Sequence, residues 1–319
     1  MQHKNPLVVI LGATATGKTA LGISLARRFN GEIISADSRQ IYKDLDIGSG
    51  RGRPREPKIK ITDGVWVEEG IPIHLYNLFQ PSIQVTVIEY QRLAEEVISD
   101  LHVQNRLPLV VGGTGFYISS LLGDTVIEDI PANPEFRARA ENMDLEDLVN
   151  ELEEVSPKVA ELTDLKNPRR VIRALERIRY KKMNPNYRTP KPKKRDAVQI
   201  GLTASVEELA HRIRLRTLQM IEDGFLEEAR RLLHIYGPSA PALTAIGYQQ
   251  FQDHLAGHGS LEEAIERKVA DEIAYSKRQL TWFKRDPRII WFDVGAEDYK
   301  KATEQKIPEL VELYLKGNI

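Results

Sequence analysis

Short apolar runs alternate with amphipathic stretches along the first third of the chain. Amphipathic segments with a helical period predict helices near 18–29 and 85–104. Runs rich in β-branched and aliphatic residues predict strands at 7–11, 32–35, 73–75, 107–111, 197–202 and 289–293. Strands that alternate with helices are typical of βαβ units, so we predict a parallel sheet with helices packed on it.

A complete P-loop follows the first predicted strand directly. Its residues are Gly12, Ala13, Thr14, Ala15, Thr16, Gly17, Lys18 and Thr19. The glycines allow backbone amides to turn toward an oligophosphate, Lys18 neutralises its charge, and the Thr19 hydroxyl can ligate Mg²⁺. We therefore predict that these eight residues bind an oligophosphate, with Thr19 as a metal ligand. Alone, the loop does not identify the phosphate.

The pattern changes to helical stretches alone between residues 130 and 196, with turn signals at Pro131, Pro157 and Pro168. The strand pattern returns after this segment. We predict an α/β fold with a P-loop NTPase-like parallel sheet core, formed by 1–129 and 197–319, that carries the catalytic site. An all-helical domain, 130–196, is inserted into it.

Two further features lie at the edge of the sheet that carries the P-loop. The strand at 107–111 runs into a second glycine-rich loop, 112–115, and the strand at 32–35 leads to Asp37. Because ligands bind at the carboxyl ends of parallel strands, both loops are expected to face one pocket. Asp37 could hold Mg²⁺ through water or act as a general base. Ser38 and Gln40 could cap a turn or contact a base.

An arginine on the apolar face of a later helix is a further candidate. Ser205 and Glu208 have the spacing of a capping box, and the helix that they begin extends to about Met220. Arg216 lies on the same side as Ile213 and Met220, so it faces inward. A buried arginine needs an anion, which is either a bound diphosphate or a carboxylate of the protein.

Composition excludes several classes of protein. The chain has 319 residues, 41% of them hydrophobic and 29% charged, as in soluble globular proteins. Without cysteine it has no disulfide, thiol nucleophile or zinc–cysteine site. No histidines have metal-ligand spacing around His74, so we predict no zinc site. We found no long apolar run and no signal-peptide pattern, and therefore expect a cytoplasmic protein without membrane attachment.

Net charge is -1, which gives no indication of nucleic-acid binding, but basic residues cluster locally. The clusters are 169–173, 191–195 and 277–285, the last interleaved with Trp282 and Phe283. Each could be a solvated surface. Three in a nearly neutral chain favour binding of a polyanion.

Together these segments resemble the family of tRNA isopentenyltransferases. The resemblance rests on 12–19, 37–42, 45–48, 112–117, 167–170, 245–248 and 277–282. It implies that the P-loop holds dimethylallyl diphosphate and that Asp37 takes a proton from the exocyclic amine of an adenosine beside the anticodon. Thr14, Lys18, Thr19 and Arg216, with Mg²⁺, would stabilise the leaving diphosphate, and Asp37, Arg216 and Thr14 would be the catalytic residues.

The same resemblance implies contacts to tRNA, with the helical domain closing over its anticodon stem-loop. We also expect a monomer. The residues expected to contact tRNA are Asp37, Ser38, Arg39, Gln40, Thr114, Arg137, Arg169, Arg170, Arg173, Thr244, Gly247, Tyr248, Gln249, Lys277, Arg278, Gln279, Trp282 and Lys284. Ala13, Thr16, Ile73 and Gln249 depart from the usual family residues. The last two departures weaken the expected RNA contacts there.

Three other functions would also use a P-loop. They are prenylation of free adenine nucleotides, a small-molecule kinase, and a nucleotide-binding module without catalysis. The basic segments favour tRNA over free nucleotides, and the presence of both Asp37 and Arg216 disfavours the module. The resemblance along the later chain argues against a kinase.

Overall fold

Two compact units make up the protein. The computed structural model describes residues 5–51, 61–62 and 64–318. The first unit comprises Met1–Thr125 and Lys193–Ile319, and the second comprises Val126–Pro192. Both boundaries fall a few residues before those expected from the change in pattern.

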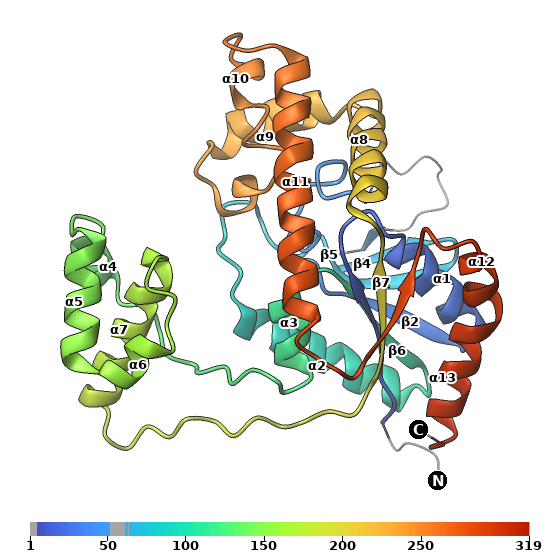
Figure 1. Cartoon of the computed structure of the whole chain (residues 1–319), viewed down its shortest axis with the longest axis horizontal. Coiled ribbons are helices and arrows are strands. Elements are labelled where there is room, and N and C mark those ends of the chain that lie inside the picture. The colour runs from blue at the N-terminus through green and yellow to red at the C-terminus, as the bar shows by residue number, and fades with distance from the viewer. Residues whose placement is uncertain (1–4, 52–60, 63, 319) are drawn as a thin grey trace. The chain divides into compact units, whose positions relative to one another are not determined.

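The first unit is built on one sheet with strand order β3-β4-β5-β2-β6-β1-β7-β8 (Figure 1). All six strands predicted from the sequence are present and run parallel to one another. They are β1 (Val8–Gly12), β2 (Gly31–Ser35), β5 (Ile71–Tyr76), β6 (Leu107–Gly112), β7 (Val198–Thr203) and β8 (Ile289–Asp293). Two further strands, β3 (Ile61–Thr62) and β4 (Gly64–Glu68), were not predicted. β4 runs antiparallel to β5, and β3 runs antiparallel to β4.

Alternate residues of β1 face opposite sides of the sheet, as the strand period requires. Val9 and Leu11 belong to the hydrophobic cluster that contains α2 (Val87–Val103) and α3 (Gly115–Leu121). Val8 and Ile10 belong to the cluster with α1 (Lys18–Arg28) and α13 (Ile307–Leu315). All five residues of β1 are buried, which explains why its sequence reads as a continuous apolar run.

The remaining helices of the first unit follow β7 and β8. They are α8 (Val206–Glu222), α9 (Phe225–Tyr236), the 3₁₀ turn Pro241–Thr244, α10 (Gln252–Leu255), α11 (Leu261–Phe283), α12 (Tyr299–Lys301) and the π-helical turn Ala302–Lys306. In Figure 1 the long helix α11 lies beside α8 at one end and beside α3 at the other. None of the described helices is long and apolar enough to cross a membrane.

At the start of α8, only one of the two hydrogen bonds of the predicted capping box is formed. Ser205 accepts a hydrogen bond from the Glu208 amide at 3.1 Å. The Glu208 carboxylate does not complete the box but pairs with Arg212 at 2.5 Å, one helical turn further along. In α11, by contrast, Ser260 and Glu263 form both bonds of the motif.

In the second unit the described residues form helices without a strand, as predicted. The helices are α4 (Pro134–Ala140), α5 (Leu145–Val155), α6 (Pro157–Glu161) and α7 (Pro168–Met183). The unit has its own core, with Phe136, Leu152 and Leu175 buried among its members. Three of these helices have proline in the first turn, where a missing amide donor costs nothing.

A buried carboxylate on α9 holds the loop that follows β2. Glu228 accepts hydrogen bonds from the amides of Asp46, Ile47 and Gly48 at 2.8–3.0 Å and from the Tyr248 hydroxyl at 2.7 Å. The ring packs so closely that a Cβ on Gly48 would lie 2.1 Å from the Tyr248 hydroxyl oxygen. This is a correction to the expected tRNA contact, because the side chain of Tyr248 is fully buried.

We expect Glu228→Gln to lower the free energy of unfolding by about 2–3 kcal/mol, because an amide NH₂ would face backbone N–H groups that need an acceptor. Urea unfolding followed by tryptophan fluorescence measures the change. Glu227→Gln is the matched control, since Glu227 is exposed on the same helix. Equal effects of the two substitutions would contradict this role for Glu228.

Candidate active site

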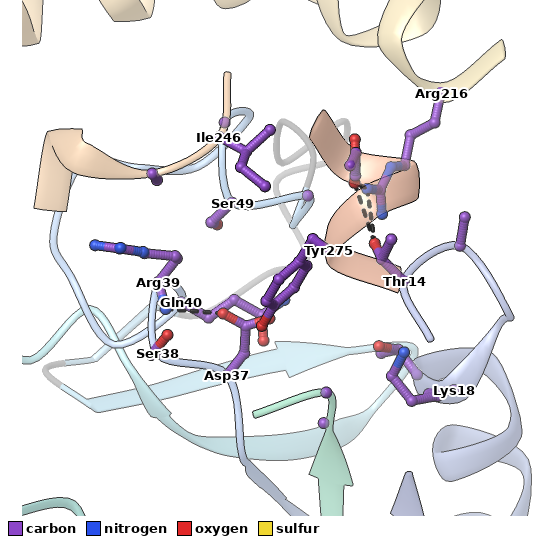
Figure 2. Close-up of a pocket in the computed structure, with 18 of the residues that line it drawn as sticks. Thr14, Lys18, Asp37, Ser38, Arg39, Gln40, Ser49, Arg216, Ile246 and Tyr275 are labelled. Carbon is purple, nitrogen blue, oxygen red and sulfur yellow. Dashed lines mark hydrogen bonds and ion pairs between the residues drawn. The ribbon is translucent and has the colours of Figure 1, made fainter. Parts of the chain in front are cut away.

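A cleft of about 810 Å³ opens at the carboxyl ends of β1, β2 and β6 in the first unit. Residues of the P-loop, the segment 37–40 and the second glycine-rich loop all line it, together with side chains from α8 and α11 (Figure 2). The prediction that both glycine-rich loops face one pocket is confirmed.

The P-loop adopts the turn that its glycines permit. Gly12 has φ 140° and lies so close to β7 that a Cβ would be 2.1 Å from the carbonyl oxygen of Leu202. Gly17, with φ 82°, caps the start of α1. Positive φ values of this kind disfavour residues with a side chain. The loop therefore needs glycine at both positions for its conformation.

Five of the eight P-loop residues line the cleft, namely Thr14, Ala15, Gly17, Lys18 and Thr19. Ala13 and Thr16 are buried behind it, where the Thr16 hydroxyl donates to the Ala13 carbonyl at 2.8 Å. Gly12, Ala13 and Thr16 thus shape the loop, and their side-chain positions do not face the cleft.

Lys18 is held inside the cleft by a short hydrogen bond from its ammonium group to the Ala13 carbonyl, 2.5 Å long. Burial lowers the pKa of Lys18 to about 8, with Asp37 raising it and Arg216 lowering it. A bound polyanion would favour the protonated form. Lys18 is therefore placed to bind negative charge at neutral pH.

Asp37 emerges from the end of β2 and its carboxylate is oriented by its own turn, since Oδ1 accepts from the Arg39 amide at 2.8 Å. The Thr114 hydroxyl accepts from the Ser38 amide at 3.1 Å. The Gln40 side chain accepts from the Ser35 hydroxyl at 2.8 Å, so Gln40 has the local structural bond that was one of its two interpretations. Asp37, Ser38, Arg39 and Gln40 all line the cleft (Figure 2).

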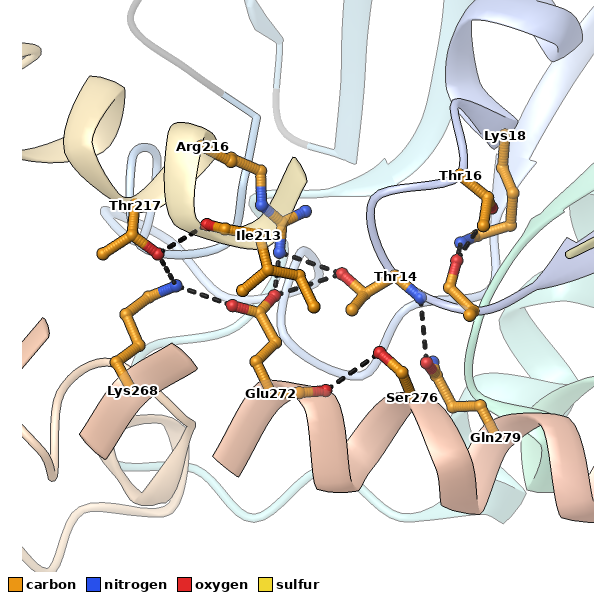
Figure 3. A network of polar contacts seen from close by, with 11 residues as sticks. Thr14, Thr16, Lys18, Ile213, Arg216, Thr217, Lys268, Glu272, Ser276 and Gln279 are labelled. Atoms are coloured by element: carbon orange, nitrogen blue, oxygen red, sulfur yellow. Dashed lines mark hydrogen bonds and ion pairs between the residues drawn. The ribbon is translucent and has the colours of Figure 1, made fainter. Parts of the chain in front are cut away.

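Arg216 reaches into the same cleft from α8 and meets the P-loop. Its Nη2 donates to the Thr14 hydroxyl at 2.9 Å and pairs with Glu272 on α11 (Figure 3). Of the two interpretations of this inward arginine, the salt bridge is confirmed. Binding of a diphosphate stays a prediction, for which Arg216 has a place in the wall of the cleft. Arg214, on the other side of the same helix, pairs with Glu262 and Glu266 at the surface.

The oxygen ligands of the cleft suit a hard cation. The Thr19 hydroxyl and the Asp37 carboxylate line one space, and hydroxyl and carboxylate oxygens are ligands that Mg²⁺ accepts alongside phosphate oxygens. Within the described residues, no group of three or more His, Cys, Asp or Glu side chains is arranged to hold a metal ion. His74 pairs with Glu32 on the neighbouring strand, 2.6 Å away.

Comparison with known proteins identifies the family of this chain. The sequence model of the IPP transferase family matches residues 40–286. The chain belongs to the IPP transferase family. The tRNA dimethylallyltransferase of Carboxydothermus hydrogenoformans is 38% identical, over 95% of this chain and 96% of that protein. The tRNA dimethylallyltransferase of Anoxybacillus flavithermus is also 38% identical, over 98% and 96%.

Solved structures agree with this assignment. The full-length tRNA isopentenylpyrophosphate transferase from Bacillus halodurans has a TM-score of 0.71 and 35% identity, covering 98% of this chain and 97% of that chain. A eukaryotic dimethylallyltransferase acting on tRNA has a TM-score of 0.81 and 26% identity, covering 98% and 80%. The resemblance inferred from the sequence and the P-loop NTPase-like α/β fold are both confirmed.

In this member of the IPP transferase family, the residues expected to contact RNA lie in different environments. Arg39, Thr244 and Arg278 line the cleft, and the Arg39 guanidinium donates to the Pro241 carbonyl at 2.7 Å. Gln249, Lys277 and Lys284 are exposed. Tyr275, which sequence analysis missed, also lines the cleft. Burial raises the pKa of its phenol to about 12, so the group is neutral at physiological pH.

Three other residues expected to contact RNA are buried or hydrogen-bonded within the first unit. The Gln279 amide accepts from the Thr14 amide at 3.0 Å and donates to the Gly113 carbonyl at 2.8 Å, and its side chain is buried. Gly247 is buried, and the half-buried Trp282 donates to the Ser119 hydroxyl at 3.2 Å. For Gln279 and Gly247 the expected RNA contact is corrected to a structural role, since neither faces the surface.

Within the second unit most of the expected arginines already have carboxylate partners. Arg137 and Arg173 share Glu176, at 2.8 Å and 3.1 Å, and Arg170 pairs with Asp164 at 3.4 Å. Arg169 is exposed at the start of α7. The first two arginines therefore have a fixed orientation, in which Glu176 serves as their common acceptor.

We expect the affinity for an alkyl diphosphate to fall about tenfold between pH 7 and pH 9, because the ligand binds protonated Lys18 and is itself fully ionised above about pH 7. In the free protein Lys18 has a pKa of about 8, so rising pH deprotonates it in this range. Titration calorimetry at several pH values measures the trend. Lys18→Arg keeps its charge and should flatten the profile, whereas an unchanged profile would contradict the assignment to Lys18.

Proposed function

We propose that the protein transfers a dimethylallyl group from dimethylallyl diphosphate to the exocyclic amine of the adenosine 3′-adjacent to the anticodon in tRNA, releasing diphosphate. The observation that carries this proposal is that one cleft contains both groups that can bind a diphosphate and a carboxylate that can accept a proton. Lys18, Thr14 and Arg216 lie on its P-loop side, and Asp37 lies at the end of β2. Family membership and relatives named for tRNA dimethylallyl transfer support the same reaction.

The cationic side of the cleft suits the leaving group. As the allylic carbon–oxygen bond breaks, its electron pair moves onto the diphosphate and increases the negative charge there. The Lys18 ammonium, the Arg216 guanidinium and the Thr14 hydroxyl are already in place to stabilise it. Donors that are placed before the reaction stabilise the developing charge most, since they need no reorganisation at that moment.

The acidic side suits the nucleophile. The exocyclic nitrogen of adenosine forms a bond to the allylic carbon and loses a proton, which the Asp37 carboxylate accepts. The hydrogen bond from the Arg39 amide fixes this carboxylate toward the cleft. A base inside an RNA stem-loop is stacked, so the adenosine must leave its stack to enter the cleft.

Mg²⁺ is the proposed cofactor. The Thr19 hydroxyl would hold it together with the diphosphate, and Asp37 could take part through water because its carboxylate lines the same cleft. When bound, the ion neutralises part of the charge on the diphosphate. Lys18 and Arg216 supply the remaining positive charge from the protein.

The RNA surface is proposed to include the exposed basic residues of α11 and the second unit. Three of the expected RNA contacts border the cleft, namely Arg39, Thr244 and Arg278. Lys277 is exposed on α11, and Lys284 is exposed just after its end. Exposed lysines and arginines of this kind pair with phosphates. We place the reaction in the cytoplasm and expect a monomer.

A single assay tests the reaction. The protein is incubated with labelled dimethylallyl diphosphate, Mg²⁺ and either an anticodon stem-loop RNA, AMP or ATP. We expect label in the RNA alone, because the basic surface serves only a polyanionic acceptor. Label in AMP would replace this function with prenylation of free nucleotides, and phosphate transfer from ATP would exclude prenyl transfer altogether.

Asp37→Asn should lower the rate of transfer by about 10²–10⁴-fold while donor affinity changes little, since the amide keeps the shape but cannot accept the proton. Single-turnover rates and donor affinities are measured at several Mg²⁺ concentrations. Should activity return at high Mg²⁺, or donor affinity fall along with the rate, Asp37 would instead belong to the metal site.

A further inference from the structure

One carboxylate on α11 is the meeting point of three side chains of the cleft (Figure 3). Glu272 Oε1 accepts from the Thr14 hydroxyl at 3.2 Å and pairs with Arg216. Glu272 Oε2 accepts from the Lys268 ammonium at 2.6 Å. The residue is only 7% exposed and lines the cleft. Two groups that the proposed reaction needs for the leaving diphosphate therefore share one acceptor.

A carboxylate in this place opposes the binding of an anion. It lies in the wall of a cleft whose other charged groups, Lys18 and Arg216, attract diphosphate, and burial strengthens the repulsion. A buried carboxylate is also costly unless it is paired. Its presence is explained by what it does to the cations. Without it, Arg216 and Lys268 would face each other with no counter-ion between them.

Lys268 connects this carboxylate to α8. The Lys268 ammonium bridges Glu272 and the Thr217 hydroxyl, which in turn donates to the Ile213 carbonyl one helical turn earlier on α8. Lys268 thus links the Glu272 carboxylate to the helix that carries Arg216.

α11 also fixes the backbone of the P-loop. Lys268, Glu272, Ser276 and Gln279 follow one another at helical spacing, so they form a stripe on one face of the helix. The Ser276 hydroxyl donates to the Glu272 carbonyl at 2.9 Å, and the Gln279 side chain accepts from the Thr14 amide at 3.0 Å. The helix therefore holds Thr14 at two points, the hydroxyl through Glu272 and the amide through Gln279.

We propose that Glu272 is a positioning residue of the prenyl transfer, which holds Arg216 in place for the leaving diphosphate and fixes the Thr14 side chain beside it, and that Lys268 is its buried counter-cation. This inference rests on the proposed function. Glu272 acts through Arg216 and the Thr14 side chain, which it orients. Because its charge repels diphosphate before the reaction, it favours the rate of transfer and not the affinity for the donor.

The test separates these two effects in the variant Glu272→Gln. We expect the single-turnover rate with anticodon stem-loop RNA to fall about 10–100-fold, since the loss of an oriented donor costs about this much or more. The inhibition constant of inorganic diphosphate, measured as a competitor of dimethylallyl diphosphate, should stay the same or decrease, because a repelling charge has been removed. A residue that only stabilises the fold would not produce this split between rate and affinity.

The matched control is Glu266→Gln. Glu266 lies on α11, like Glu272, and pairs with Arg214 of α8, the helix that also carries Arg216. This pair, however, is exposed at the surface. We expect its rate and inhibition constant to match those of the unchanged protein. A combined variant, Arg216→Gln with Glu272→Gln, should lose less than the product of the two single losses, since Glu272 acts largely through Arg216.

Removal of one partner from a buried ion pair can unfold a protein. The variant Lys268→Met with Glu272→Gln removes the pair together and is expected to show the same split. A parallel loss of rate and diphosphate affinity, an unchanged rate, or fully multiplicative losses would overturn the positioning role. If the unchanged protein itself fails to prenylate RNA, the proposed function falls and this inference with it. Normal transfer by the unchanged protein together with an unaffected Glu272→Gln overturns this inference alone.

Discussion

The arrangement of the cleft depends on keeping several positive charges close together in a place with little water. Lys18 and Lys268 both have pKa values lowered by burial, and burial lowers the pKa of Arg216 too. Like charges at such positions repel one another until an anion arrives. Glu272 is the internal anion of this cluster, and its two oxygens divide between Arg216 and Lys268. An acidic residue can thus be part of a site for a polyanion.

The parallel sheet makes this concentration of charge possible. β1 pairs with β6 on one side and with β7 on the other, so the P-loop and the loop after β6 end side by side. The amides at the start of α1 point into the same space, which provides positive potential without another charged side chain. The long helix α11 forms one wall of the cleft. Its polar stripe contacts Thr14 and Gly113, and its apolar residues pack in the core.

The two sides of the cleft are held by separate devices. On the P-loop side the donors are fixed by ion pairs and hydrogen bonds from α8 and α11. On the acceptor side, Asp37 is oriented by its own turn, and the loop after it is held through the amides that Glu228 binds. The P-loop side and the Asp37 side of the cleft are therefore fixed by different elements of the fold.

Local pattern by itself determined the six parallel strands, the P-loop turn, the place of Asp37 and the inward side of Arg216, because each depends on residues within a few positions of one another. Only the tertiary structure decided which distant groups became partners. Glu272, Lys268 and Gln279 look in the sequence like ordinary residues of a charged helix, and Tyr248 like a surface aromatic in a polar segment. Their roles follow from packing. The burial that makes Glu272 an acceptor for Arg216 and Tyr248 a partner of Glu228 arises when segments that are not adjacent in the chain meet.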